Sequence, residues 1–229
     1  IFFTIGKFLF SGWMDGLVAV YFGFSALLIY ILTIEEQDSF KKNKILIYIA
    51  FCFFTTLTLI KNEGVVLLLI IFIATFLLNL ITGKLRKKFY ILFFLSLSLL
   101  PIIAWKSFCF YNDVGYIEYY NIDILSKLIP RLYNLKSYEL VSYFLLLNEK
   151  FLISLTFFIF SVFINWNKKL FNFVIISSIM YLLILAFIFL STPYDLYWQL
   201  NSAAARVVRS VSFLLSFFAL YNIKNKINY

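Results

Sequence analysis

Histidine is absent from this 229-residue chain, and cysteine, proline and glycine are scarce, with two, three and seven residues. The absence of histidine excludes imidazole as a catalytic acid or base and as a metal ligand. Cys52 lies inside an apolar run and Cys109 lies just beyond another, so neither indicates a disulfide or metal framework. The chain also contains no glycine-rich phosphate loop, serine nucleophile elbow or internal repeat.

What the chain has in abundance is apolar surface. Hydrophobic residues make up 63% of it and the mean hydropathy is +0.94, whereas a soluble domain is about 45–50% apolar. Charge-free stretches of roughly 16–21 residues recur, which is about the length that crosses a hydrocarbon core. We therefore expect an all-α, polytopic transmembrane helical bundle. The net charge of +9 is then a topology signal and does not indicate nucleic-acid binding.

Seven membrane-crossing helices are predicted within a single transmembrane domain, 1–229, which we interpret as a fragment because it begins with Ile1 in mid-pattern. The predicted spans are Gly16–Ile34, Ile45–Ile60, Val65–Ile81, Phe89–Trp105, Phe151–Asn165, Leu170–Leu190 and Ala204–Asn222. Every second connection is basic: Lys41, Lys42, Lys44; Lys84, Arg86, Lys87, Lys88; Lys168, Lys169; Lys224, Lys226. The positive-inside rule makes that face cytoplasmic.

The opposite, extracytoplasmic face then receives three polar elements. The first is a turn, Lys61–Gly64, in the middle of the apolar run Ile45–Ile81. This run is too long for one span, so we predict that it forms a helical hairpin. Gly64 is expected to permit the turn. Lys61 and Glu63 either close the hairpin as a pair or line a site, and ionisable residues at membrane depth are usually functional.

The second element is Asp15, which immediately precedes a charge-free span. A carboxylate at a helix N-terminus is stabilised by the helix dipole, which is a sufficient structural explanation. Alternatively, Asp15 is placed to bind a divalent cation or a polar substrate group.

The third element is "STPYDLYWQLNSAAARVVRS", in which Asn201 or Ser202 is the expected N-cap of the last helix. Ser202, Arg206 and Arg209 fall on one helical stripe. The arginines either snorkel to the headgroups or bind a lipid phosphate or pyrophosphate. The aromatic residues Tyr194, Tyr197 and Trp198 are candidates to stack on a sugar or a polyprenyl chain.

An outer segment, 106–150, mixes acidic and basic residues and is expected to form interfacial helices on the outer leaflet. Pro130 should break or kink its helical run. Its charges include Arg131, and we interpret most of them as a solvated face.

Together, "GWMDGLVAVYF", "TLIKNEGVVLLL" and "STPYDLYWQLNSAAARVVRS" resemble the bacterial multi-spanning glycosyltransferases of the C-type fold (GT-C), which include relatives of protein O-mannosyltransferases and aminoarabinose transferases. The residues that match that pattern are Asp15, Lys61, Glu63, Gly64, Trp198, Ser202 and Arg206. Gln199 departs from it, standing where histidine is frequent, and Gly16 stands near where proline is common.

The resemblance implies an enzyme that uses a polyprenyl-phosphate sugar donor and a lipid, glycan or protein acceptor at the outer face of the bacterial inner membrane. It implies catalytic roles for Asp15, Lys61 and Glu63. Substrate binding would fall to Arg206, Arg209, Tyr194, Tyr197, Trp198 and Ser202. The family's principal acidic residue would precede Ile1, so the fragment alone is expected to be inactive.

Three other readings remain open from the sequence. A secondary transporter would place its charges near the bilayer midplane and show internal repeats. An envelope polysaccharide polymerase or ligase would use the same donors with a large outer loop, for which 106–150 is a candidate. A purely structural membrane subunit is the third.

Overall fold

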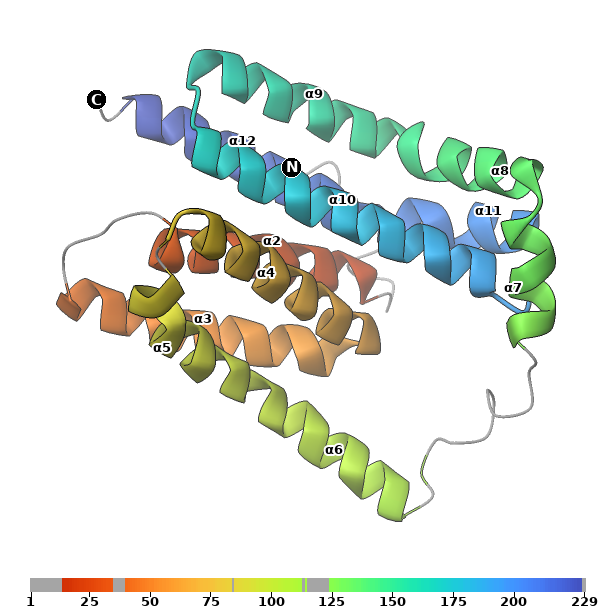
Figure 1. The fold of residues 1–229 in the computed structure, drawn as a ribbon, viewed down its shortest axis with the longest axis horizontal. Coiled ribbons are helices and arrows are strands. Elements are labelled where there is room, and N and C mark those ends of the chain that lie inside the picture. The colour runs from red at the N-terminus through yellow and green to blue at the C-terminus, as the bar shows by residue number, and fades with distance from the viewer. Residues whose placement is uncertain (1–13, 35–39, 84, 113, 115–123, 228–229) are drawn as a thin grey trace.

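The structure is a computed structural model that describes residues 14–34, 40–83, 85–112, 114 and 124–227. Every element in these ranges is a helix, so the all-α prediction is confirmed (Figure 1). The elements are α2 (Asp15–Thr33), α3 (Phe40–Ile60), α4 (Asn62–Ile81), α5 (Leu85–Ser96), the 3₁₀ turn η1 (Leu97–Leu99), α6 (Leu100–Tyr111), α7 (Ile124–Leu132), α8 (Leu135–Leu146), α9 (Glu149–Ile164), α10 (Lys168–Ser191), α11 (Leu196–Val207) and α12 (Arg209–Ile227).

Within the described ranges, five helical segments are long and apolar enough to cross a membrane: Asp15–Thr33, Asn62–Ile81, Phe89–Tyr111, Lys168–Ser191 and Leu196–Ile227. The pair α8 and α9, bent by 63°, makes a sixth if it counts as one span. The shorter apolar helix Lys44–Ile60 corresponds to the remaining predicted span. The chain is therefore a polytopic helical membrane protein.

The bundle is held together by large apolar and aromatic side chains. Helix α12 packs most extensively against α9 and α2, and α2 also packs on α3 and α4. Tyr30 of α2 meets Phe218 of α12 edge to face, with ring centroids 5.5 Å apart, and both contact Phe173 of α10. Such ring contacts stabilise the interior beyond the area they bury.

The two ends of the bundle carry different polar elements. At one end, α9 and α12 are joined where Asn165 Nδ2 donates to the carbonyl of Asn222 at 3.1 Å, and Asn222 Nδ2 donates back to the carbonyl of Asn165 at 2.7 Å. The starts of α3, α5 and α10 and the end of α12, which carry the basic residues assigned to the cytoplasmic face, also lie at this end, at the left of Figure 1. The opposite end, called here the Asp15 end, holds the start of α2, the turn between α3 and α4, and α11.

The N-cap expected at Asn201 or Ser202 is wrong. Helix α11 begins at Leu196, and the Asp195 carboxylate accepts a hydrogen bond from the backbone N–H of Trp198 at 2.8 Å. Asp is as good an N-cap as Asn or Ser, and Asp195 comes six residues before Asn201. Pro130 lies inside α7, which ends two residues later at Leu132.

Candidate functional site

Asp15 begins α2, and its side chain is only 7% exposed. A carboxylate withdrawn from water in this way needs cationic or hydrogen-bonding partners, because an uncompensated buried charge is strongly destabilising. The helix dipole, proposed from the sequence as a sufficient explanation for Asp15, therefore accounts for only part of the stabilisation of this carboxylate. Both carboxylate oxygens of Asp15 lie against cations brought in from distant segments.

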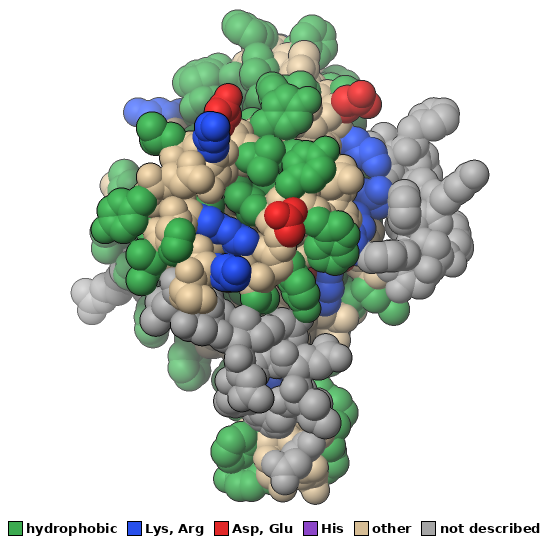
Figure 2. All heavy atoms as spheres, turned by 90° about the vertical axis from the view of Figure 1, so that its right-hand side faces the viewer, with side chains coloured by type: hydrophobic (Ala, Val, Ile, Leu, Met, Phe, Trp, Pro, Cys, Tyr) green, Lys and Arg blue, Asp and Glu red, His purple; other side chains and the backbone are tan. Residues whose placement is uncertain are grey.

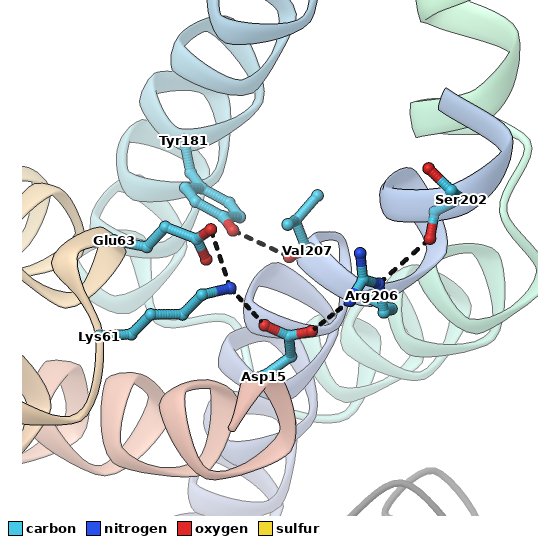
Figure 3. A network of polar contacts seen from close by, with 7 residues as sticks. All are labelled: Asp15, Lys61, Glu63, Tyr181, Ser202, Arg206 and Val207. Atoms are coloured by element: carbon cyan, nitrogen blue, oxygen red, sulfur yellow. Dashed lines mark hydrogen bonds and ion pairs between the residues drawn. The ribbon is translucent and has the colours of Figure 1, made fainter. Parts of the chain in front are cut away.

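The first of these cations is Lys61, which forms the turn between α3 and α4. Its backbone is extended, with φ −159° and ψ 148°, so the two helices are separate at this residue. Lys61 Nζ donates to Asp15 Oδ1 at 2.6 Å and lies 3.0 Å from Glu63 Oε1 (Figure 3). Two residues that are two apart cannot face each other on a helix, and the extended backbone at Lys61 is what allows the Lys61–Glu63 pair.

Gly64 serves the turn in a different way from the one expected. A Cβ built on Gly64 would lie 1.9 Å from the carbonyl oxygen of Leu57 and 2.7 Å from the carbonyl carbon of Leu57. The glycine is therefore required by the close approach of α4 to the backbone of α3 and not by a left-handed conformation; among described glycines only Gly83 has positive φ. This contact fixes where Lys61 and Glu63 stand.

The second cation is Arg206, near the end of α11. Its Nη1 lies 3.5 Å from Asp15 Oδ2, and its Nε donates to the carbonyl of Ser202 at 3.1 Å. The side chain is 25% exposed. The backbone contact one turn earlier holds the guanidinium against its own helix and directs it toward α2.

Asp15, Lys61, Glu63 and Arg206 are called here the ion-pair cluster. Their formal charges sum to zero, and three segments that are far apart in the sequence supply them. Burial disfavours the charge on Lys61, but the hydrogen bonds to Asp15 and Glu63 outweigh it, so the pKa of Lys61 is raised above its ordinary value of 10.5. The Lys61 ammonium is thus charged at physiological pH.

A divalent cation at Asp15 fits this arrangement poorly. Calcium and magnesium need several oxygen ligands, whereas each Asp15 oxygen already faces a cationic side chain. In the part of the chain that the structure describes, no three His, Cys, Asp or Glu side chains are grouped to hold a metal ion. We therefore assign no step to a metal.

The remaining predicted site residues lie along α11 and the start of α12. Arg209, the first residue of α12, is 4% exposed. Ser202 contributes its carbonyl to Arg206, while its hydroxyl donates to the carbonyl of Gln199 at 3.1 Å. Ser202 thus supports the cluster through its backbone.

The aromatic residues lie at or just before the start of α11, whereas Arg206 lies near its end. Tyr194 and Trp198 pair with ring centroids 5.9 Å apart, and Tyr197 packs at 5.9 Å against Phe144 of α8. All three are about half exposed, at 49%, 58% and 58% for Tyr194, Tyr197 and Trp198. Trp198 and Arg206 are eight residues apart on α11, or about 12 Å along the helix.

Two residues that hold this end of the molecule were not predicted. Tyr181 of α10 is buried, and its hydroxyl donates to the Val207 carbonyl at 2.8 Å, beside Arg206 (Figure 3). The chain has 16 tyrosines, and nothing in the apolar span around Tyr181 distinguishes it.

Arg131 of α7 is an exception to the solvated face expected for most charges of 106–150. Its guanidinium donates to the carbonyls of Leu190, Thr192 and Tyr194, at 3.2, 2.5 and 2.6 Å. These carbonyls end α10 and begin the connection to α11. Arginine is well suited to such carbonyls at a helix C-terminus, so Arg131 fixes the connection that leads to Asp195 and α11.

Viewed from this end, the surface shows lysine and arginine side chains set among hydrophobic ones, with fewer acidic side chains (Figure 2). An open pocket of about 520 Å³ lies between the start of α4 and α6, lined by Asn62, Val65, Val66, Ile102, Ile103, Lys106 and Ser107. It is mostly apolar, and Asn62 stands between the two cluster residues of the α3–α4 turn.

No family model matches the chain, and neither the curated proteins nor the solved structures contain a match to it.

Proposed function

We propose that the protein is a membrane glycosyltransferase that moves a sugar from a polyprenyl-phosphate donor to an envelope acceptor. The acceptor is a lipid, a glycan or a protein, and the reaction takes place on the extracytoplasmic side of the bacterial inner membrane. The ion-pair cluster is the observation that supports this proposal. It collects two cations and two carboxylates at one end of an apolar bundle.

The chemistry requires that an acceptor hydroxyl attack the anomeric carbon while the bond from that carbon to the phosphate oxygen breaks. The electron pair of the breaking bond stays on the phosphate, whose growing charge needs cations. Lys61 and Arg206 are our candidates for that role. Lys61 has three N–H donors, and its contacts to Asp15 and Glu63 account for two of them.

The acceptor proton must pass to a base. Of the two carboxylates in the cluster, Glu63 is 43% exposed and Asp15 is 7% exposed. Asp15, with a cation on each oxygen, is suited to holding Lys61 and Arg206 at a fixed spacing. Glu63 is therefore the carboxylate of the cluster that an acceptor can approach.

The position of the cluster also bears on the alternatives. Asp15 is the first residue of α2, and Lys61 and Glu63 lie at the turn between α3 and α4, so three of the four members lie at helix termini. A secondary transporter would place its coupling charges near the middle of the spans. This location favours interfacial transfer over transport.

The test is transfer of a radiolabelled sugar from polyprenyl-phosphate hexose or aminopentose donors in membranes containing the full-length protein. Arg206→Gln should lower kcat/KM by about 100-fold or more, the usual effect of removing one preorganised donor. Arg206→Lys should retain part of the activity because it keeps the charge but not the planar fork. Lys127→Gln, an exposed change on α7, is the matched control. Wild-type turnover in Arg206→Gln, at equal membrane insertion, would refute the role.

A further inference from the structure

Helices α11 and α12 form one nearly continuous helix, in which Val208 is a single intervening residue with helical backbone angles. The Val208 N–H bonds the carbonyls of Ala204 and Arg206, and α12 begins at the next residue. The two arginines of the site flank Val208, with Arg206 before it and Arg209 after it. The position of this junction relative to the other helices therefore decides where the two guanidinium groups lie.

A side chain from a third helix contacts this junction. Tyr181 of α10 is 4% exposed, and its hydroxyl donates to the Val207 carbonyl at 2.8 Å. In a dry interior a backbone carbonyl needs a hydrogen-bond partner. The bond from Tyr181 therefore joins α10 to the residue that follows Arg206.

We propose that Tyr181 is a positioning residue for Arg206. By bonding the Val207 carbonyl, it ties α10 to the residue next to Arg206 and so holds Arg206 beside Asp15. Without the hydroxyl this tie is lost, and the junction of α11 and α12 can shift relative to Asp15. The effect of Tyr181 on catalysis rests on the proposed function, whereas its effect on the Asp15–Arg206 pair does not.

The first experiment measures the Asp15–Arg206 interaction without any substrate. Asp15→Asn and Arg206→Gln are combined in a double-mutant cycle of unfolding free energies in detergent micelles, once with Tyr181 and once with Tyr181→Phe. If Tyr181 positions Arg206, the coupling should fall to about half or less in the Tyr181→Phe background. An unchanged coupling would overturn the proposal, even if Tyr181→Phe is itself destabilising.

Tyr30→Phe is the matched control. It removes another buried tyrosine hydroxyl, fifteen residues or about 22 Å along α2 from Asp15. It should leave the Asp15–Arg206 coupling unchanged. A loss of coupling in Tyr30→Phe would show that any buried tyrosine acts this way, and would also overturn the proposal.

The second experiment uses the transfer assay. Tyr181→Phe should lower kcat/KM by about 10- to 100-fold, as expected for a misplaced catalytic contact. It should cause little further loss in an Arg206→Lys background. Equal losses in both backgrounds would mean that Tyr181 does not act through Arg206. If the wild-type protein transfers no sugar, the proposed function fails, while the coupling measurement still decides the role of Tyr181.

Discussion

The substitution Asp15→Asn tests the ion-pair cluster most directly, because it keeps the shape of the side chain and removes its charge. Asp15 is 7% exposed, whereas Lys61 and Arg206 are 37% and 25% exposed. An exposed ion pair contributes about 0–1 kcal/mol, and breaking a buried pair costs about 3–5 kcal/mol. This mixed burial places the expected loss of unfolding free energy between these limits, at about 2 kcal/mol.

Equilibrium unfolding in detergent micelles measures this loss, and Glu139→Gln is the control. Glu139 is an exposed carboxylate on α8, so its substitution should change stability by less than about 0.5 kcal/mol. The double variant Asp15→Asn/Lys61→Gln should lose less than the sum of the single variants, because removing Lys61 takes away a cation that has lost its main partner. Strict additivity together with a loss below about 0.5 kcal/mol for Asp15→Asn would refute our account of the cluster.

The pH dependence of the same measurement follows from Lys61. Its pKa is raised above 10.5, so the contribution of the Asp15–Lys61 pair is complete below 10.5 and is lost as pH rises through the higher folded-state value. The stability difference between wild type and Asp15→Asn should therefore be constant from about pH 6 to about pH 9. A steady decline over that range would contradict the sign of the shift.

Two further substitutions test the frame around the site. Gly64→Ala should destabilise the protein by about 3 kcal/mol or more, because the new Cβ would lie 1.9 Å from the Leu57 carbonyl oxygen. The control Gly23→Ala meets only the side-chain ring of Phe217, which can move, and should cost less in the same unfolding assay. Equal losses of stability in the two variants would argue against a backbone clash at Gly64. Arg131→Ala should cost about 2 kcal/mol through its three carbonyl contacts. The control Lys127→Ala, at an exposed position on the same helix, should leave the unfolding free energy nearly unchanged. If Arg131→Ala also leaves it unchanged, Arg131 does not stabilise the connection between α10 and α11.

The convergence of Asp15, Lys61, Glu63 and Arg206 at one end of the bundle could be anticipated from the sequence. Each residue adjoins a helix end, and alternating span directions bring those particular ends to the same side. Their detailed pairing could not be anticipated. The contact of Asp15 with both Lys61 and Arg206 depends on how α2 packs between α3, α4 and α12, and no local pattern encodes that packing.

The sequence by itself determined the class of the molecule and the approximate position of its spans. The reason is that the thickness of the bilayer sets the length of apolar run that a membrane-crossing helix needs. Only the tertiary structure decided the roles of Tyr181 and Arg131. Each donates hydrogen bonds to backbone carbonyls of another helix. Because every residue has a backbone carbonyl, the sequence does not show which residue is the partner. The same reason explains Gly64, whose need for glycine arises from the backbone of Leu57 and not from its own conformation.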